Sequence, residues 1–261
     1  MPHWRATLAY DGTPYNGWQV QPDRTTVQGT LAEALHRITG ETVLPQGSGR
    51  TDTGVHALAQ VATFSLTASI PTANLHHALN RTLPLSIRVL ALAEAPPAFH
   101  ARYNALRKTY EYRILPRTTE LETICSPFLA PYVWVCPRLL SLDLLHEAAA
   151  HVLGTHDFTS FAAVNPDQTE RREPTIHDNT RTIHASFWTQ DKGPDGLLRY
   201  RVTGSGFLHH MVRNLVGTFV EAGSGRIPPD SIAAILHAKS RSAAGPTAPA
   251  KGLFLAGVEY Q

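Results

Sequence analysis

Two side chains of opposite charge, Arg50 and Asp52, lie two positions apart in a polar segment that contains three glycines, residues 47–56. Glycine permits backbone angles that other residues avoid and lets a ligand approach the main chain closely. A carboxylate beside a guanidinium is held in its ionised form, so Asp52 has the chemistry of a nucleophile or a general base.

The same segment has three other interpretations: a surface turn, a phosphate-binding loop and a dinucleotide-binding loop. Asp and Gly are common turn formers, so a surface turn remains open on spacing alone. A phosphate-binding loop would end in Gly-Lys-Ser/Thr, and that ending is missing. A dinucleotide fingerprint also fails, because Asp52 stands where the third glycine should be.

Two further candidates lie in the second half of the chain. Tyr110 falls in an alternating strand pattern, where a tyrosine most often packs in the core. His209, Arg213 and Gly217 are spaced four apart and share one stripe of a helix whose opposite face is apolar. A solvated helix face is the alternative interpretation of that stripe.

Basic and aromatic residues alternate between positions 100 and 113, a combination that suits phosphate contact and base stacking. An amphipathic strand with charged edges is the alternative. The residues expected to contact a nucleic acid are His100, Arg102, Arg107 and Lys108, with His209 from the helix stripe.

No metal or cofactor is expected. The histidine pairs at 76–77 and 209–210 are sequence neighbours that point apart on a regular element, so neither makes a two-ligand set. Cys125 and Cys136 are too few for a thiolate site or a disulfide framework.

The composition is that of a globular protein. Of 261 residues, 43% are hydrophobic and 17% charged, with a net charge of +2 and a pI of about 8.6. This weak basic lean is compatible with a polyanionic partner. The sequence has neither an apolar stretch long enough to span a bilayer nor a leader pattern at its start, so a cytoplasmic location is expected.

Hydrophobic periodicity predicts the order β-α-β-β-α-β twice, which is the ferredoxin-like pattern. We expect an α+β fold of two such halves, residues 1–105 and 106–261, whose mainly antiparallel sheets join around a central active-site cleft. The expected strands are 4–10, 43–46, 59–65, 87–92, 108–115, 181–190, 197–204 and 253–260; the helices are 27–38, 71–80, 142–152, 211–220 and 232–237; the long loops are 165–178 and 239–251.

The string GRTDTGVHA closely resembles the Gly-Arg-Thr-Asp-x-Gly-Val-His-Ala/Gly signature of the TruA family of tRNA pseudouridine synthases. Other family segments follow in the same order along nearly the whole chain. One departure is the stretch 167–178, which looks longer than usual. The matching strings are YDGTPYNGWQVQ, TVQGTLAEAL, FHAR, RKTYEY, LGTHDFTSF and GSGFLHHMVRN.

The resemblance implies a chemistry for these residues. The family's catalytic Asp corresponds to Asp52, its active-site tyrosine to Tyr110, and the arginine that pairs with the Asp to Arg213, with Arg50 in support. A uridine base would leave its stack, detach from the sugar at nitrogen and rejoin through carbon, without a cofactor. Whether Asp52 attacks as a nucleophile or acts as a base on the sugar stays open.

The resemblance also implies partners: uridines 38–40 of the tRNA anticodon stem-loop, and a homodimer across which the tRNA lies. Asp11, Tyr15, Trp18 and Gln19 either shape the tRNA-binding surface or pack the first turn. The alternatives are a related synthase with another RNA target, a non-catalytic RNA-binding protein of the same fold, and a metal-dependent hydrolase.

Overall fold

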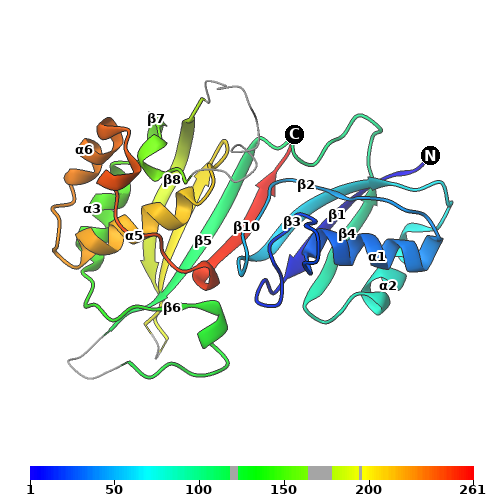
Figure 1. Ribbon diagram of the computed structural model, residues 1–261, viewed down its shortest axis with the longest axis horizontal. Coiled ribbons are helices and arrows are strands. Elements are labelled where there is room, and N and C mark those ends of the chain that lie inside the picture. Colours follow the sequence, from blue (N-terminus) through cyan, green and yellow to red (C-terminus); the bar gives the residue numbers. More distant parts are fainter. Residues whose placement is uncertain (118–122, 164–177, 194–195) are drawn as a thin grey trace. The chain divides into compact units, whose positions relative to one another are not determined.

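The computed structural model describes residues 1–117, 123–163, 178–193 and 196–261, which form two compact units (Figure 1). Unit 1 comprises Met1–Lys108 and Phe254–Gln261, and unit 2 comprises Thr109–Leu253. The predicted loop at 165–178, with its inserted residues, lies outside the described part of the chain apart from Asp178.

Unit 1 has the predicted β-α-β-β-α-β order. Strand β1 lies between β4 and β3 and is antiparallel to both, and β2 pairs antiparallel with the far edge of β3. The elements are β1 (His3–Tyr10), α1 (Val27–Thr39), β2 (Gln46–Gly47), β3 (His56–Ser65), α2 (Thr72–Thr82) and β4 (Ile87–Glu94).

The last strand of the chain, β10 (Leu253–Glu259), also belongs to this sheet. Phe254 and Leu255 pair in parallel with His56 and Ala57 at the start of β3. The compact units therefore differ from the halves expected from the sequence, which assigned this strand to the second half.

Local sequence explains most elements of unit 1. In β1 every second residue is buried, from Trp4 to Tyr10, as a strand covered on one face requires. Helix α1 starts at the cap Thr26, whose hydroxyl accepts a hydrogen bond from the Gly29 N–H, and ends at Gly40, where φ is 74°.

The predicted strand over 43–46 is wrong in its bounds, because β2 covers only Gln46–Gly47. Pro45 has no N–H to offer a neighbouring strand, which limits pairing before it. Its carbonyl instead accepts a hydrogen bond from Gln28 Nε2 at 2.8 Å.

Unit 2 has the strand order β5-β9-β8-β7, with β6 parallel to β5; β8 is antiparallel to both β9 and β7. Strands β6 and β7 were not predicted. Both are short, and β7 (GTHD) is polar. The elements are β5 (Arg107–Leu115, whose first two residues belong to unit 1), β6 (Trp134–Val135), α3 (Leu142–Ala150), β7 (Gly154–Asp157), β8 (Thr180–Gln190), β9 (Leu198–Gly204), α5 (Met211–Gly223) and α6 (Ser231–Ala238).

Helices α3 and α5 pack against each other, and α3 also packs on β8. Trp188 of β8, Tyr200 of β9 and Phe219 of α5 form a buried aromatic cluster, in which the Tyr200 ring centroid lies 5.1 Å from that of Trp188 and 5.3 Å from that of Phe219. The α+β class and the mainly antiparallel pairing are confirmed. Among the residues that the structure describes, no helix has the length and apolar character needed to cross a bilayer.

Candidate active site

The loop between β2 and β3 carries the predicted carboxylate. Asp52 is half-buried, Arg50 before it is exposed, and Thr51 between them is buried. The Asp52 carbonyl accepts a hydrogen bond from the Val55 N–H at 3.1 Å, which closes a tight turn just before β3. The buried Thr51 and this turn therefore fix the backbone of the loop, and Asp52 remains partly exposed to solvent.

The segment after β1 supports this loop from one side. The Trp18 N–H donates to the Thr51 carbonyl at 3.0 Å, and the Tyr10 hydroxyl lies 2.8 Å from Thr51 Oγ1. Gly17 has φ of +81°, and a Cβ there would lie only 2.6 Å from the Thr51 carbonyl oxygen. This close backbone contact explains why the position accepts only glycine without strain.

Strand β3 supports the loop from the other side through Gln60, whose side chain is fully buried. Its Oε1 accepts a hydrogen bond from Ser48 Oγ at 2.6 Å, and its Nε2 donates to the Gly49 carbonyl at 2.8 Å. Sequence reasoning missed Gln60, although a polar residue inside an otherwise apolar strand was the available signal.

Lys108, predicted to bind RNA, also contacts this loop. Its Nζ donates to the Ser48 carbonyl at 2.6 Å. The ammonium group therefore stabilises the loop backbone directly before Arg50. Any contact that Lys108 makes with RNA has to be made from this position.

Burial raises the pKa of Tyr10 to about 12, against the lowering effect of its hydrogen bond with Thr51. An unfolded tyrosine ionises near 10, so this group stabilises the fold fully below pH 10 and loses that contribution as the pH rises towards 12.

Between pH 10 and 12 the free energy of unfolding should fall less steeply for Tyr10→Phe than for the unchanged protein. The two slopes should differ by about 1.4 kcal/mol per pH unit. Urea denaturation of both proteins at several pH values in this range measures it. The other buried tyrosines contribute the same pH dependence to both proteins. Identical slopes would therefore contradict a raised pKa of Tyr10.

The remaining basic candidates of unit 1 lie in the connection from β4 to β5. His100 and Tyr103 stack with ring centroids 4.3 Å apart, beside the exposed Arg102. Arg107 is exposed, and its Nη1 lies 4.0 Å from Glu259 Oε2, a surface ion pair that contributes little to stability.

The residues of the first turn divide by burial. Trp18 and Tyr15 are buried at 2% and 4% exposure, so they pack the turn. Asp11 Oδ1 lies 3.2 Å from His56 Nδ1 and also accepts the Thr13 N–H. Of the four residues predicted to shape this turn, Gln19 is the one that is exposed.

In unit 2 Tyr110 is 8% exposed and packs edge-on against Phe207, with ring centroids 5.0 Å apart. Phe207 lies in the short segment that leads from β9 into α5. His209 and His210 follow it with their rings 3.9 Å apart, so the expectation that these neighbours point apart is wrong. Both precede α5, which begins at Met211, and His210 has φ of 58°, so the pair does not lie on a regular element.

Arg213, on the first turn of α5, is held by a late segment of the chain, residues 246–252, which we call the strap. Its Nε donates to the Ala248 carbonyl at 2.8 Å, and the Ala248 N–H donates back to the Arg213 carbonyl at 3.1 Å. The next strap residue, Pro249, accepts the hydroxyl of Tyr112 at 2.7 Å. A Cβ on Gly217 would lie 1.7 Å from the Pro246 carbonyl oxygen, so the backbone of the strap packs directly against the backbone of α5.

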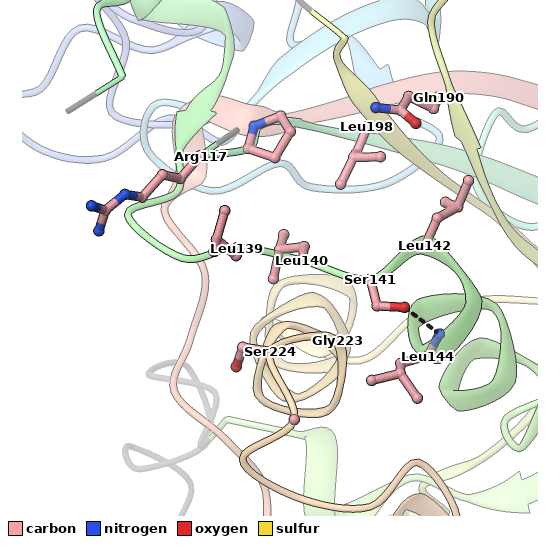
Figure 2. A pocket seen from close by; sticks show the side chains of 12 residues that line it. Arg117, Leu139, Leu140, Ser141, Leu142, Leu144, Gln190, Leu198, Gly223 and Ser224 are labelled. Atoms are coloured by element: carbon pink, nitrogen blue, oxygen red, sulfur yellow. Dashed lines mark hydrogen bonds between the residues drawn. The ribbon is translucent and has the colours of Figure 1, made fainter. Parts of the chain in front are cut away.

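Unit 2 also has a hollow of about 550 Å³ where α5 ends and α3 begins (Figure 2). Leucines from both the α3 region and β9 line much of it, with the Gly223–Gly225 end of α5. The predicted site residues are not among those that line it, so the hollow is a separate feature.

The predicted residues therefore divide between the two units. Unit 1 holds the loop with Arg50 and Asp52, together with His100, Arg102, Arg107 and Lys108, and the structure brings Lys108 onto the loop. Unit 2 holds Tyr110, His209 and Arg213 on the β5 strand and around the start of α5.

Comparison with known proteins places these features in a family. A family model described as tRNA pseudouridine synthase matches residues 6–104 and 148–261. The tRNA pseudouridine synthase A of Solibacter usitatus (strain Ellin6076) is 48% identical over 260 residues, which cover 100% of both chains. Proteins of the same name from Moorella thermoacetica (strain ATCC 39073 / JCM 9320) and Bacillus subtilis (strain 168) are 45% and 41% identical and cover 100% and 98% of each chain.

Proposed function

The chain belongs to the tRNA pseudouridine synthase family, and on that premise we propose that it isomerises uridines 38–40 of the tRNA anticodon stem-loop to pseudouridine. The observation that carries the proposal is the loop of unit 1. It presents a half-buried carboxylate, Asp52, on a backbone fixed from both sides by Trp18 and Gln60.

The reaction needs no external reactant. The bond from the sugar to the base nitrogen breaks, the base turns, and a carbon of the base bonds to the same sugar carbon. That base carbon loses its proton and the freed nitrogen gains one, so the product is an isomer of the substrate. The target base has to leave its stack first, because a carboxylate cannot reach it inside a helix.

We assign the residues as follows. Asp52 acts on the sugar or the base, as a nucleophile or as a base on the sugar. Arg50 and Arg213 orient it, and Tyr110 stacks on the displaced uracil and handles a proton. The strap supports the role of Arg213, since it fixes the guanidinium through Ala248.

Substrate binding is assigned to the basic residues, since RNA helices are recognised mainly through phosphates and sugars. These are His100, Arg102, Arg107, Lys108 and His209. We further propose that the protein acts in the cytoplasm as a homodimer with tRNA lying across both subunits. Sedimentation with and without tRNA tests the dimer.

The decisive experiment is incubation of the protein with unmodified tRNA, followed by position-resolved detection of pseudouridine. Pseudouridine at positions 38–40 supports the proposal. Pseudouridine elsewhere points to the alternative of a related synthase with another target. Tight tRNA binding without product would favour the non-catalytic RNA-binding alternative.

Tyr110→Phe separates the two roles given to this tyrosine. The variant keeps the ring and its contact with Phe207 but loses the hydroxyl. We expect kcat to fall about 10²-fold or more while tRNA affinity stays unchanged, because general acid–base groups contribute about 10²–10⁴ in rate. Single-turnover assays measure this.

The matched control is Tyr200→Phe, which removes a buried hydroxyl bonded to Ser186 in the same unit. We expect it to lower stability by about 1 kcal/mol with little change in kcat. Equal kcat for Tyr110→Phe and the unchanged protein would restrict Tyr110 to stacking.

A further inference from the structure

The connection from β4 to β5 presents one aromatic ring to solvent. Tyr103 is 77% exposed, although its neighbour Ala101 is completely buried. A single exposed aromatic is common on protein surfaces and means little by itself. Tyr103 differs because hydrogen bonds and ring contacts fix the turn that carries it.

The turn that carries Tyr103 is closed by its own hydrogen bonds. The Arg102 N–H donates to His100 Nδ1 at 3.0 Å, the His100 N–H donates to Asn104 Oδ1 at 2.7 Å, and the Asn104 N–H donates to the His100 carbonyl at 3.1 Å. The His100 ring stacks on the Tyr103 ring, and Arg102 Cζ lies 5.9 Å from the ring centre. The ring is therefore supported by two groups of its own turn.

The turn is also tied to the framework of the Asp52 loop. The Tyr260 hydroxyl donates to the Ala101 carbonyl at 2.7 Å, and the Ala101 N–H donates to Thr63 Oγ1 of β3 at 3.4 Å. Strand β3 also carries Gln60, whose side chain bonds to Ser48 and Gly49 of the loop. The same strand thus supports both the loop and the turn.

Arginine side chains lie on this turn and next to it, one of which, Arg107, pairs with Glu259. Arg102 and Arg107 are exposed, and the guanidinium of Arg5 lies 5.6 Å and 5.5 Å from the ring centres of Phe99 and Tyr260. Exposed aromatic rings next to cations suit single-stranded nucleic acid, in which every base offers a stacking face and every phosphate a charge.

We propose that Tyr103 is a stacking platform for an unpaired base of the RNA substrate, with Arg102 at the adjacent phosphate. The inference rests on the proposed function and adds to it a fixed contact outside the reacting nucleotide. Tyr103 touches the RNA without taking part in the chemistry, so its effect falls on binding.

The test compares Tyr103→Ala and Tyr103→Phe with the unchanged protein, using unmodified tRNA. Stacking on an aromatic side chain is worth about 5- to 150-fold in affinity per base. We expect Tyr103→Ala to raise both the Kd and the KM by that factor with kcat nearly unchanged. Tyr103→Phe should restore both values.

The control is Phe128→Ala, which removes an 88% exposed aromatic ring from unit 2. It should leave the Kd, the KM and the melting temperature unchanged. Unaltered tRNA affinity of Tyr103→Ala, or a loss that Tyr103→Phe does not restore, would overturn the inference. If the unchanged protein forms no pseudouridine, the proposed function fails, while the binding measurements still decide the role of Tyr103.

Discussion

Replacing Asp52 by alanine is expected to lower pseudouridine formation at least about 10³-fold, the scale seen when a central catalytic group is removed. The reason is that no other described acid is carried by this loop, and the reaction needs a carboxylate at the sugar or base. Affinity for tRNA should stay within about threefold, because phosphate contacts dominate RNA binding. Single-turnover assays and filter binding measure the two effects separately.

Two comparisons sharpen this result. Asp52→Asn keeps the shape of the side chain and removes only its charge, so it should be nearly as inactive as Asp52→Ala. Thr53→Ala alters the exposed neighbour in the same loop and should retain activity. Full turnover by either Asp52 variant would show that the mechanism is wrong.

Replacing Gly17 by alanine is expected to reduce both stability and activity. Alanine at a φ of +81° costs about 1–2 kcal/mol, and the Cβ would also meet the Thr51 carbonyl oxygen at 2.6 Å. Overpacking of this kind typically costs a further 1–3 kcal/mol, roughly. Thr51 directly precedes Asp52, so a shift of Thr51 also displaces the carboxylate. We therefore expect the kcat of Gly17→Ala to fall more than about tenfold.

Gly40→Ala supplies the matched control. Gly40 has a similar φ of +74° at the end of α1, but a Cβ there meets nothing within 4 Å. This variant should show the backbone cost alone, with normal activity of the folded protein. If the two variants lose the same stability and Gly17→Ala keeps normal kcat, then the contact between Gly17 and Thr51 does not position the carboxylate.

The elements predicted well are those that short-range rules determine. Helix α1 follows from apolar residues at helical spacing, and the structure closes it with Thr26 as the N-cap and Gly40 as the C-cap. Strand β1 follows from strict alternation. Each signal lies within the element itself, so no knowledge of its neighbours is needed.

The elements predicted poorly depend on partners that are distant in sequence. β7 is a strand because it pairs with β8, and nothing in Gly154–Asp157 alone favours a strand. β10 was predicted as a strand, but its pairing with His56 and Ala57 was not. Such pairings depend on tertiary packing, which overrides weak local preference.

The candidate site shows the same division. Asp52 stands out from its motif, whereas Gln60 is marked in the sequence only as a polar residue in an apolar strand. Its bonds to Ser48 and Gly49 show what it supports. Lys108 was predicted from its charge to meet RNA, and its hydrogen bond to the loop backbone could not be foreseen. Motifs identify the reacting groups, and the structure identifies what holds them.

The strap has a consequence for the order in which a ribosome makes this protein. Ala248 and Pro249, the acceptors for Arg213 and Tyr112, are translated well after both residues. A nascent chain that stops before residue 246 holds both donors without their acceptors. The surroundings of Arg213 and Tyr112 are therefore completed only after the strap has been translated.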